Sequence, residues 1–148
     1  MTARKRPEGA GKLNAAERSL KYLRKLGYTA EVCEQYKAIV AGRGQQAKFK
    51  GGYRKDLFGF ADIIAYDARA TVAVQTTSRK QMSAHLRKYR GDTDVAARIY
   101  GWLAKAGRMF VIHGWEPLEV ANKTKAGTHI RWHLTVRVVT FADLEELP

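Results

Sequence analysis

Two neighbouring stretches in the middle of the chain carry side chains that could do metal chemistry. Residues 58–66 are apolar, Gly or Ala except for Asp62, and a buried carboxylate needs a partner cation because leaving it unpaired is costly. Residues 70–77 alternate as a β-strand does, which puts Gln75 and Thr77 side by side near the end of that strand. If the two stretches pair, Asp62 meets Gln75 across the ladder. Such oxygen ligands predict a site for Mg²⁺ or Mn²⁺.

Two further carboxylates precede these strands. Apolar residues recur at helical spacing over residues 13–26, with Asn14 and Glu17 in the order of a capping box. Glu17 flanks the apolar stripe, so it could either cap the helix or lean over the sheet as a functional carboxylate. Glu34 lies near the end of a strand predicted over residues 28–36, where it is either a second acidic candidate or simply exposed.

The rest of the pattern predicts an α/β domain. The segment from Lys37 to Lys55 is rich in Gly, Lys and Arg without a sustained period, which predicts a mobile loop. After the two central strands, the pattern predicts helices over 79–89 and 92–106, a strand over 109–113, a loop over 114–127, a strand over 129–141 and a short acidic surface turn. The predicted order is α-β-β-β-α-α-β-β, with a mixed central sheet flanked by helices.

Basic and aromatic side chains are interleaved in two of these segments. Charge follows the phosphates of a nucleic acid, and rings can stack on its bases, although a solvated basic loop would have the same composition. The predicted contact residues are Lys48, Lys50, Tyr53, Arg54 and Lys55 in the loop, and Arg79, Lys80, Arg87 and Lys88 in the first basic helix.

The composition of the 148 residues favours one domain with a polyanionic partner. Lys and Arg number 27 against 14 Asp and Glu, a net charge of +13, which indicates nucleic acid, DNA first and RNA not excluded. No stretch reaches the ~20 apolar residues of a spanning helix, so no membrane partner is expected. Residues 1–12 are predicted to be a flexible basic arm before a single domain over 13–148. One cysteine, Cys33, and no apolar leader fit a reducing, cytoplasmic location.

These motifs, in this order, resemble the PD-(D/E)XK nuclease superfamily. The opening NAAERSLKYLRKLGYTAEV, residues 14–32, is most similar to archaeal Holliday-junction resolvases, where a glutamate on the first helix precedes a Leu-rich face ending in Gly-Tyr or Gly-Phe. GFAD, residues 59–62, resembles the Gly-x-x-Asp form of the second motif. VAVQTTS, residues 72–78, stands in the place of the hydrophobic-Glu-x-Lys motif, and the DLFGF and VQTTS phrases also resemble phage-encoded proteins of unassigned role.

The resemblance implies a restriction-endonuclease-like core and hydrolysis of phosphodiester bonds with Mg²⁺ or Mn²⁺. It implies that Asp62 is the bridging metal ligand and that the Thr76 carbonyl completes the shell. Gln75 would replace the usual acidic ligand, and its neutral amide lowers the affinity for metal. Glu17 would be the first-helix carboxylate that binds the metal directly or through water.

One catalytic position departs from the family pattern. Thr77 stands where the family has a lysine that orients the attacking water and neutralises the transition state. Lys80, or a lysine of the 37–55 segment, would then supply that charge, and Asp56 or Glu34 would restore the missing carboxylate.

Hypotheses of different classes therefore remain open. The chain could be a metal-dependent DNA endonuclease, structure-specific or junction-resolving, or a DNA-binding protein on the same fold with impaired catalysis. A structural or RNA-associated protein, in which Asp62 only accepts backbone hydrogen bonds or pairs with an arginine, is the third. The apolar faces around Trp102 and Trp132 could form a homodimer interface or belong to the core.

Overall fold

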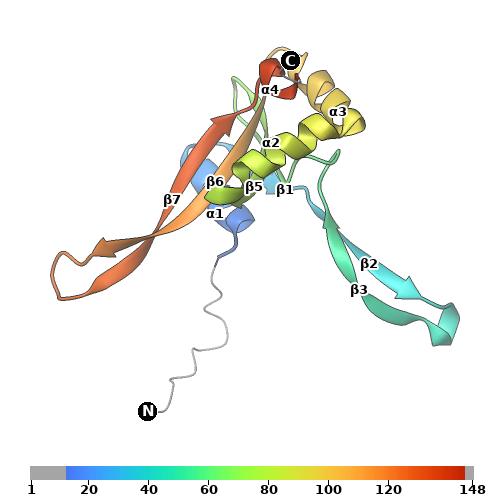
Figure 1. Cartoon of the computed structure of the whole chain (residues 1–148), viewed down its shortest axis with the longest axis horizontal. Coiled ribbons are helices and arrows are strands. Elements are labelled where there is room, and N and C mark those ends of the chain that lie inside the picture. Colours follow the sequence, from blue (N-terminus) through green and yellow to red (C-terminus); the bar gives the residue numbers. More distant parts are fainter. Residues whose placement is uncertain (1–12, 146–148) are drawn as a thin grey trace.

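A computed structural model describes residues 13–145 of the chain, which form a central sheet flanked by helices and a separate hairpin (Figure 1). The predicted arm at 1–12 and residues 146–148 lie outside the described range. The elements are α1 (Ala15–Lys25), β1 (Thr29–Val32), β2 (Gln35–Ala41), η1 (Gly44–Gln46), β3 (Lys48–Lys55), β4 (Ile63–Tyr66), β5 (Thr71–Ser78), η2 (Arg79–Gln81), α2 (Met82–Gly91), α3 (Thr93–Leu103), β6 (Arg108–Ala121), β7 (Thr128–Val138) and α4 (Phe141–Leu144).

The main sheet has five strands in the order β1-β4-β5-β6-β7. The β5–β6 pair is parallel and the other neighbours are antiparallel, so the sheet is mixed. The predicted α/β class, with a mixed sheet flanked by helices, is confirmed. Helices α2 and α3 connect the parallel strands, as a parallel pair requires a long crossover.

Two apolar clusters hold the helices on the sheet. On one face, Phe60, Tyr89 and Phe110 belong to the core beneath α2 and α3. On the other face, Leu23 of α1 packs with Ile63 of β4 and other buried residues of the sheet. Ile63, the first residue of β4, pairs with Val74 of β5. This pairing fixes Asp62, the residue before Ile63, against β5.

Helix α1 begins where its capping box predicts. The Asn14 side chain accepts a hydrogen bond from the Glu17 N–H at 2.8 Å, and the Glu17 carboxylate accepts one from the Asn14 N–H at 2.8 Å. The helix is anchored by the fully buried Ser19, whose hydroxyl contacts His113 Nδ1 and the Trp115 indole N–H, each at 2.9 Å. The capping interpretation of Glu17 is therefore confirmed.

The predicted loop over 37–55 is wrong, because β2 and β3 form an antiparallel hairpin that projects from the body of the protein (Figure 1). A register shift between Ala38 and Val40 interrupts the pairing, and Gly51 has φ 96°, so bulge and glycine together hide the strand period in the sequence. The strand predicted over 28–36 is likewise divided, into β1 and the start of β2.

The predicted loop over 114–127 is also wrong for most of its length. Strand β6 continues to Ala121 and pairs with β7 as far as Thr128, forming a second long hairpin. Strand β5 ends opposite Trp115, so beyond that residue β6 pairs with β7 alone. Pro117 is tolerated there because a strand with one neighbour can leave a position without an N–H donor. Within residues 13–145, no helix has the length and apolar character needed to cross a membrane.

Candidate metal centre

Asp62 lies immediately before β4, and its side chain points toward the neighbouring strand, β5. Its backbone N–H donates to the Val74 carbonyl at 2.9 Å, and the residue is only 3% exposed. Its Oδ2 accepts hydrogen bonds from Gln75 Nε2 at 2.7 Å, the Thr76 N–H at 2.8 Å and the Thr76 hydroxyl at 2.9 Å. The predicted meeting of Asp62 and Gln75 across the ladder is confirmed.

Burial makes the Asp62 carboxyl hard to ionise. Loss of solvent raises its pKa most, and a hydrogen bond with the Asp56 carboxyl raises it further, while the Thr76 N–H lowers it. The resulting pKa is about 8. Two neighbouring carboxyl groups avoid repulsion either by sharing a proton or by holding a cation. Asp62 and Asp56 thus form a pair whose charge a divalent ion would stabilise.

Glu34 completes an acidic cluster with this pair. Glu34, Asp56 and Asp62 each offer one carboxylate oxygen, and these oxygens lie within 4.8 Å of one another. Opposite ligands around Mg²⁺ are ~4.2 Å apart, so small side-chain rotations would bring the oxygens around one ion. Carboxylate oxygens are the ligands that Mg²⁺ and Mn²⁺ prefer. The three side chains therefore fit the predicted ion.

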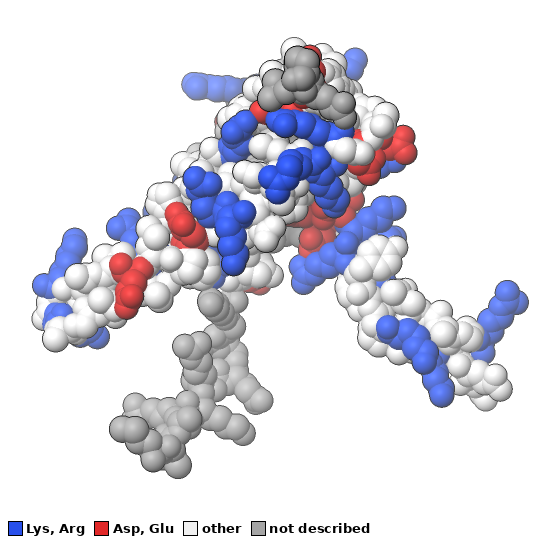
Figure 2. All heavy atoms as spheres, viewed as in Figure 1, with Lys and Arg blue, Asp and Glu red and all other residues white. Residues whose placement is uncertain are grey.

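The ends of three segments bring these carboxylates together. Glu34 occupies the break between β1 and β2, Asp56 follows β3, and Asp62 precedes β4. The Asp62 carbonyl accepts the Cys33 N–H at 2.8 Å and the Glu34 N–H at 3.3 Å, which ties the break to the start of β4. Figure 2 shows acidic side chains gathered near the base of the β2–β3 hairpin, with Lys and Arg along the hairpin.

The acidic cluster opens into a hollow of about 430 Å³. Arg54 lines it, and its Nη1 donates to Glu34 Oε1 at 2.6 Å. His85 of α2 lines it as well, and its Nδ1 is buried with no hydrogen-bond partner among the described residues. Burial, and then the charge of Lys88, lowers the pKa of His85, so the ring is neutral near pH 7. The hollow thus joins carboxylates, a guanidinium and a neutral imidazole.

Gln75 supports Asp62 with its nitrogen. Its Nε2 donates to Asp62, while its Oε1 accepts a hydrogen bond from the buried Tyr89 hydroxyl at 2.8 Å. The amide therefore orients the Asp62 carboxylate, and its oxygen would have to turn away from Tyr89 to bind metal. Thr76 also donates to Asp62, through both its N–H and its hydroxyl.

The other predicted catalytic residues lie outside the lining of this hollow. Glu17 is exposed and its carboxylate caps α1, although Asn14 at the start of that helix does line the hollow. Thr77 is a half-buried strand residue opposite Gly114 of β6. Lys80 belongs to η2 and lines a different pocket, beside Trp115. The structure gathers Asp62, Gln75 and Thr76, and it places beside Asp62 both Asp56 and Glu34, the two carboxylates that the sequence offered as alternatives.

The predicted nucleic-acid contacts are exposed on two parts of the surface. Lys48, Lys50, Tyr53, Arg54 and Lys55 lie on β3, in the projecting hairpin. Arg79 and Lys80 lie on η2, and Arg87 and Lys88 on α2. Arg54 alone among these nine lines the hollow of the acidic cluster.

His85 and Tyr89 are two residues near Asp62 that the sequence did not predict as part of the site. Both lie on α2, four residues apart, so they share a face of the helix, and Tyr89 reaches Gln75 from it. The spacing of a histidine and a tyrosine on a helix that follows the Gln75 strand is a signal, but it does not distinguish a site residue from a core residue.

Comparison of the chain with protein-family models, with curated proteins and with solved structures gives no match. Function is therefore inferred from the geometry of the site, which is where activity resides even among proteins that share a fold.

Proposed function

We propose that the protein is a metal-dependent DNA endonuclease, with a restriction-endonuclease-like core and its active centre at Glu34, Asp56 and Asp62. The observation that carries the proposal is the buried Asp62 carboxyl, which lies with the carboxylates of Asp56 and Glu34 in a cluster whose oxygens are within 4.8 Å of one another, in a chain of net charge +13. Burying such a group costs the fold free energy, whereas an ion bound for phosphodiester chemistry needs carboxylate ligands.

The order of elements around the main sheet supports the resemblance to the PD-(D/E)XK superfamily. Without the β2–β3 hairpin, the chain runs α1, β1, β4, β5, α2, α3, β6, β7. In this proposal Asp62 takes the position of the second-motif aspartate, and Gln75 that of the third-motif glutamate. The catalytic carboxylate that Gln75 lacks is supplied by Asp56 and Glu34 from the two ends of the hairpin.

Mg²⁺ or Mn²⁺, when bound, would lower the pKa of a water and stabilise the leaving oxygen. Asp62, Asp56 and Glu34 would hold the ion, and Gln75 and Thr76 keep Asp62 in place through their hydrogen bonds.

Two other side chains that line the hollow, Arg54 and His85, suit binding of the DNA phosphate and removal of a proton from water. Arg54 lies at the acidic cluster through its contact with Glu34, so its guanidinium can turn to a phosphate when DNA arrives. His85, neutral because its pKa is lowered, can accept a proton from water. Arg54 takes the electrostatic part that the family assigns to the lysine.

A DNA-binding protein with impaired catalysis is the second candidate. It is favoured by Gln75, which turns its nitrogen to Asp62, and by Thr77, which stands outside the hollow at the lysine position. This candidate predicts salt-dependent DNA binding that is indifferent to divalent ions.

Cleavage of branched and linear DNA in Mg²⁺ or Mn²⁺ separates the two candidates. We expect cleavage that disappears in Asp62→Asn and survives in Asp94→Asn, which makes the same change at an exposed position on α3. Equal cleavage by wild type and Asp62→Asn would exclude the proposed centre. Binding without cleavage in any divalent ion would favour the second candidate.

A further inference from the structure

A second pocket adjoins the acidic cluster. It has a volume of about 430 Å³, within the ~300–1,000 Å³ of small-molecule sites. Asp56 lines both this pocket and the hollow of the acidic cluster. Cys33 also lines the pocket: its thiol contacts the Ala61 carbonyl at 3.5 Å, and its backbone N–H donates to the Asp62 carbonyl at 2.8 Å. A ligand here would therefore lie next to whatever the acidic cluster binds.

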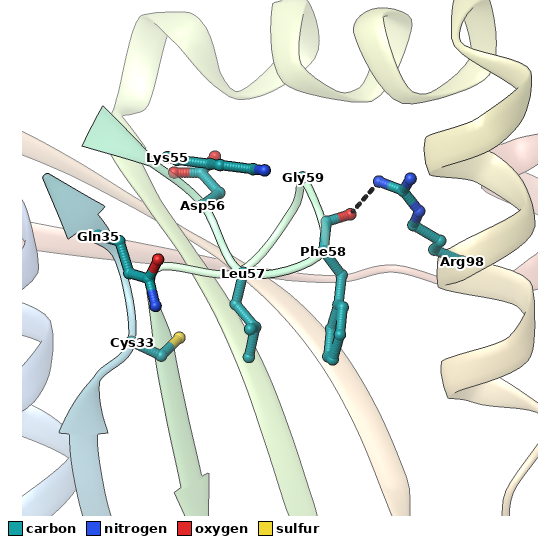
Figure 3. A pocket seen from close by; sticks show the side chains of 8 residues that line it. All are labelled: Cys33, Gln35, Lys55, Asp56, Leu57, Phe58, Gly59 and Arg98. Carbon is teal, nitrogen blue, oxygen red and sulfur yellow. Dashed lines mark hydrogen bonds between the residues drawn. The ribbon is translucent and has the colours of Figure 1, made fainter. Parts of the chain in front are cut away.

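The pocket is lined by two cationic side chains and by an aromatic ring (Figure 3). Lys55 and Arg98 extend their cationic groups toward the turn at Gly59, while Leu57 and Phe58 point to one side of it. Gln35 adds an amide that can donate and accept hydrogen bonds. This combination matches a nucleotide, because cations meet the phosphate, a ring stacks on the base and an amide pairs with the base edge.

The Phe58 ring is presented by an unusual backbone. Its φ is 56°, and it is the one non-glycine residue of the described part with a positive φ. A bulky residue seldom adopts this region, and residues held there tend to lie at functional sites. The turn holds it through the Gly59 N–H to the Asp56 carbonyl at 3.2 Å, and through Arg98 Nη1 to the Phe58 carbonyl at 3.3 Å. Phe58 as a whole stays 53% exposed.

We propose that this pocket, the Phe58 pocket (Gln35, Lys55, Phe58 and Arg98), binds an unpaired nucleotide of the DNA whose backbone lies at the acidic cluster. The inference rests on the proposed function and deepens it, since it names the feature that the protein recognises. A base inside a duplex is stacked on its neighbours and cannot reach the ring, so the pocket selects DNA with an unstacked base.

Binding in EDTA tests the pocket without involving metal. The probes are a duplex with one unpaired adenine, the fully paired duplex, and the first duplex with an abasic residue in place of the adenine. We expect the full-length protein to prefer the first by about 5- to 150-fold, the factor of one base–aromatic stack. The preference should vanish with the abasic probe.

Variants assign that preference to the ring. Phe58→Ala should reduce it to about one, and so should Phe58→Gly, which also relieves the positive φ and therefore protects folding. Phe58→Trp should retain it. Tyr66→Ala is the matched control, because Tyr66 is 54% exposed but lies at the other end of β4 from Asp62.

The inference fails if wild type does not distinguish the bulged from the paired duplex, or if the preference survives in Phe58→Gly. Its failure is separable from that of the proposed function. A nuclease that loses cleavage in Asp62→Asn yet ignores the unpaired base would overturn only the pocket. A Phe58-dependent preference without cleavage in Mg²⁺ or Mn²⁺ would overturn only the endonuclease.

Discussion

Replacing Asp62 by Asn should stabilise the protein when no divalent ion is present. An Asn oxygen can accept the same hydrogen bonds from Gln75 and Thr76 that Asp62 Oδ2 accepts. The substitution removes a carboxyl group whose ionisation is opposed by burial and by Asp56. The Asp62 carboxyl thus costs the fold stability when no divalent ion is bound.

The magnitude follows from the two pKa values of Asp62. Its pKa is about 8 in the folded protein and ~3.9 in an unfolded chain. Between these values the folded state binds more protons, so the free energy of unfolding falls by ~1.4 kcal/mol per pH unit as pH rises. The total loss is at most about 5 to 6 kcal/mol above pH 8, and about 4 kcal/mol is lost by pH 7.

Urea unfolding from pH 5 to pH 8 in EDTA measures this. The advantage of Asp62→Asn over wild type should grow by ~1.4 kcal/mol per pH unit up to about pH 7, because the contributions of groups that do not interact with Asp62 cancel in the difference. Asp94→Asn, which makes the same change at an exposed position, is the control for the loss of one carboxylate. Two results would refute the raised pKa of Asp62: a stability difference between Asp62→Asn and wild type that does not change with pH, or a variant that is less stable than wild type at pH 8.

Divalent ions should narrow the difference in stability between Asp62→Asn and wild type. An ion that binds the folded state alone stabilises it, by ~2.7 kcal/mol at 100 times its dissociation constant. Because binding requires the ionised carboxyl, the stabilisation of wild type by Mg²⁺ should increase from pH 6 to pH 8. Asp62→Asn should show little of it. Equal stabilisation of both proteins would show that the ion binds elsewhere.

Three further predictions concern other parts of the molecule. Burial lowers the pKa of His113 to about 4, so the free energy of unfolding should fall by at most about 3 kcal/mol as pH drops from ~6.5 to 4. Unfolding of His113→Gln measured over the same pH range should lack this loss. Tyr89→Phe leaves the buried Gln75 oxygen without its donor, and should cost ~1–3 kcal/mol in urea unfolding and weaken Mg²⁺ binding. Replacing Lys48 and Lys50 by Gln should lower DNA affinity at all sequences and reduce the slope of log affinity against log salt by about 2, as titration at several salt concentrations will show.

Local patterns in the sequence were sufficient to predict much of the fold. The capping box at Asn14 and Glu17 placed the first helix, and the lone carboxylate in an apolar run marked Asp62 as buried beside the next strand. These predictions hold because they depend on neighbours in sequence or on one adjacent strand. The α/β class followed from the same alternation of helical and strand periods.

The hairpins were missed because their pattern is not that of half-buried strands. All residues of β2 are exposed, so no face of it has to be apolar, and the bulge near Ala38 breaks the period. Strand β6 continues past Pro117 because β7 pairs with it there, which no local rule detects. The composition of these segments is typical of loops, and pairing between distant residues decides otherwise.

The sequence by itself determined that Asp62 is buried next to Gln75 and that the chain carries a large positive charge. Only the tertiary structure decided which groups surround Asp62. It is the β2–β3 hairpin that returns the chain from Glu34 to Asp56, so two carboxylates twenty-two positions apart meet a third. Such a meeting depends on the length and direction of the hairpin and on the bonds that fix its base, and it leaves no trace in the spacing of the residues.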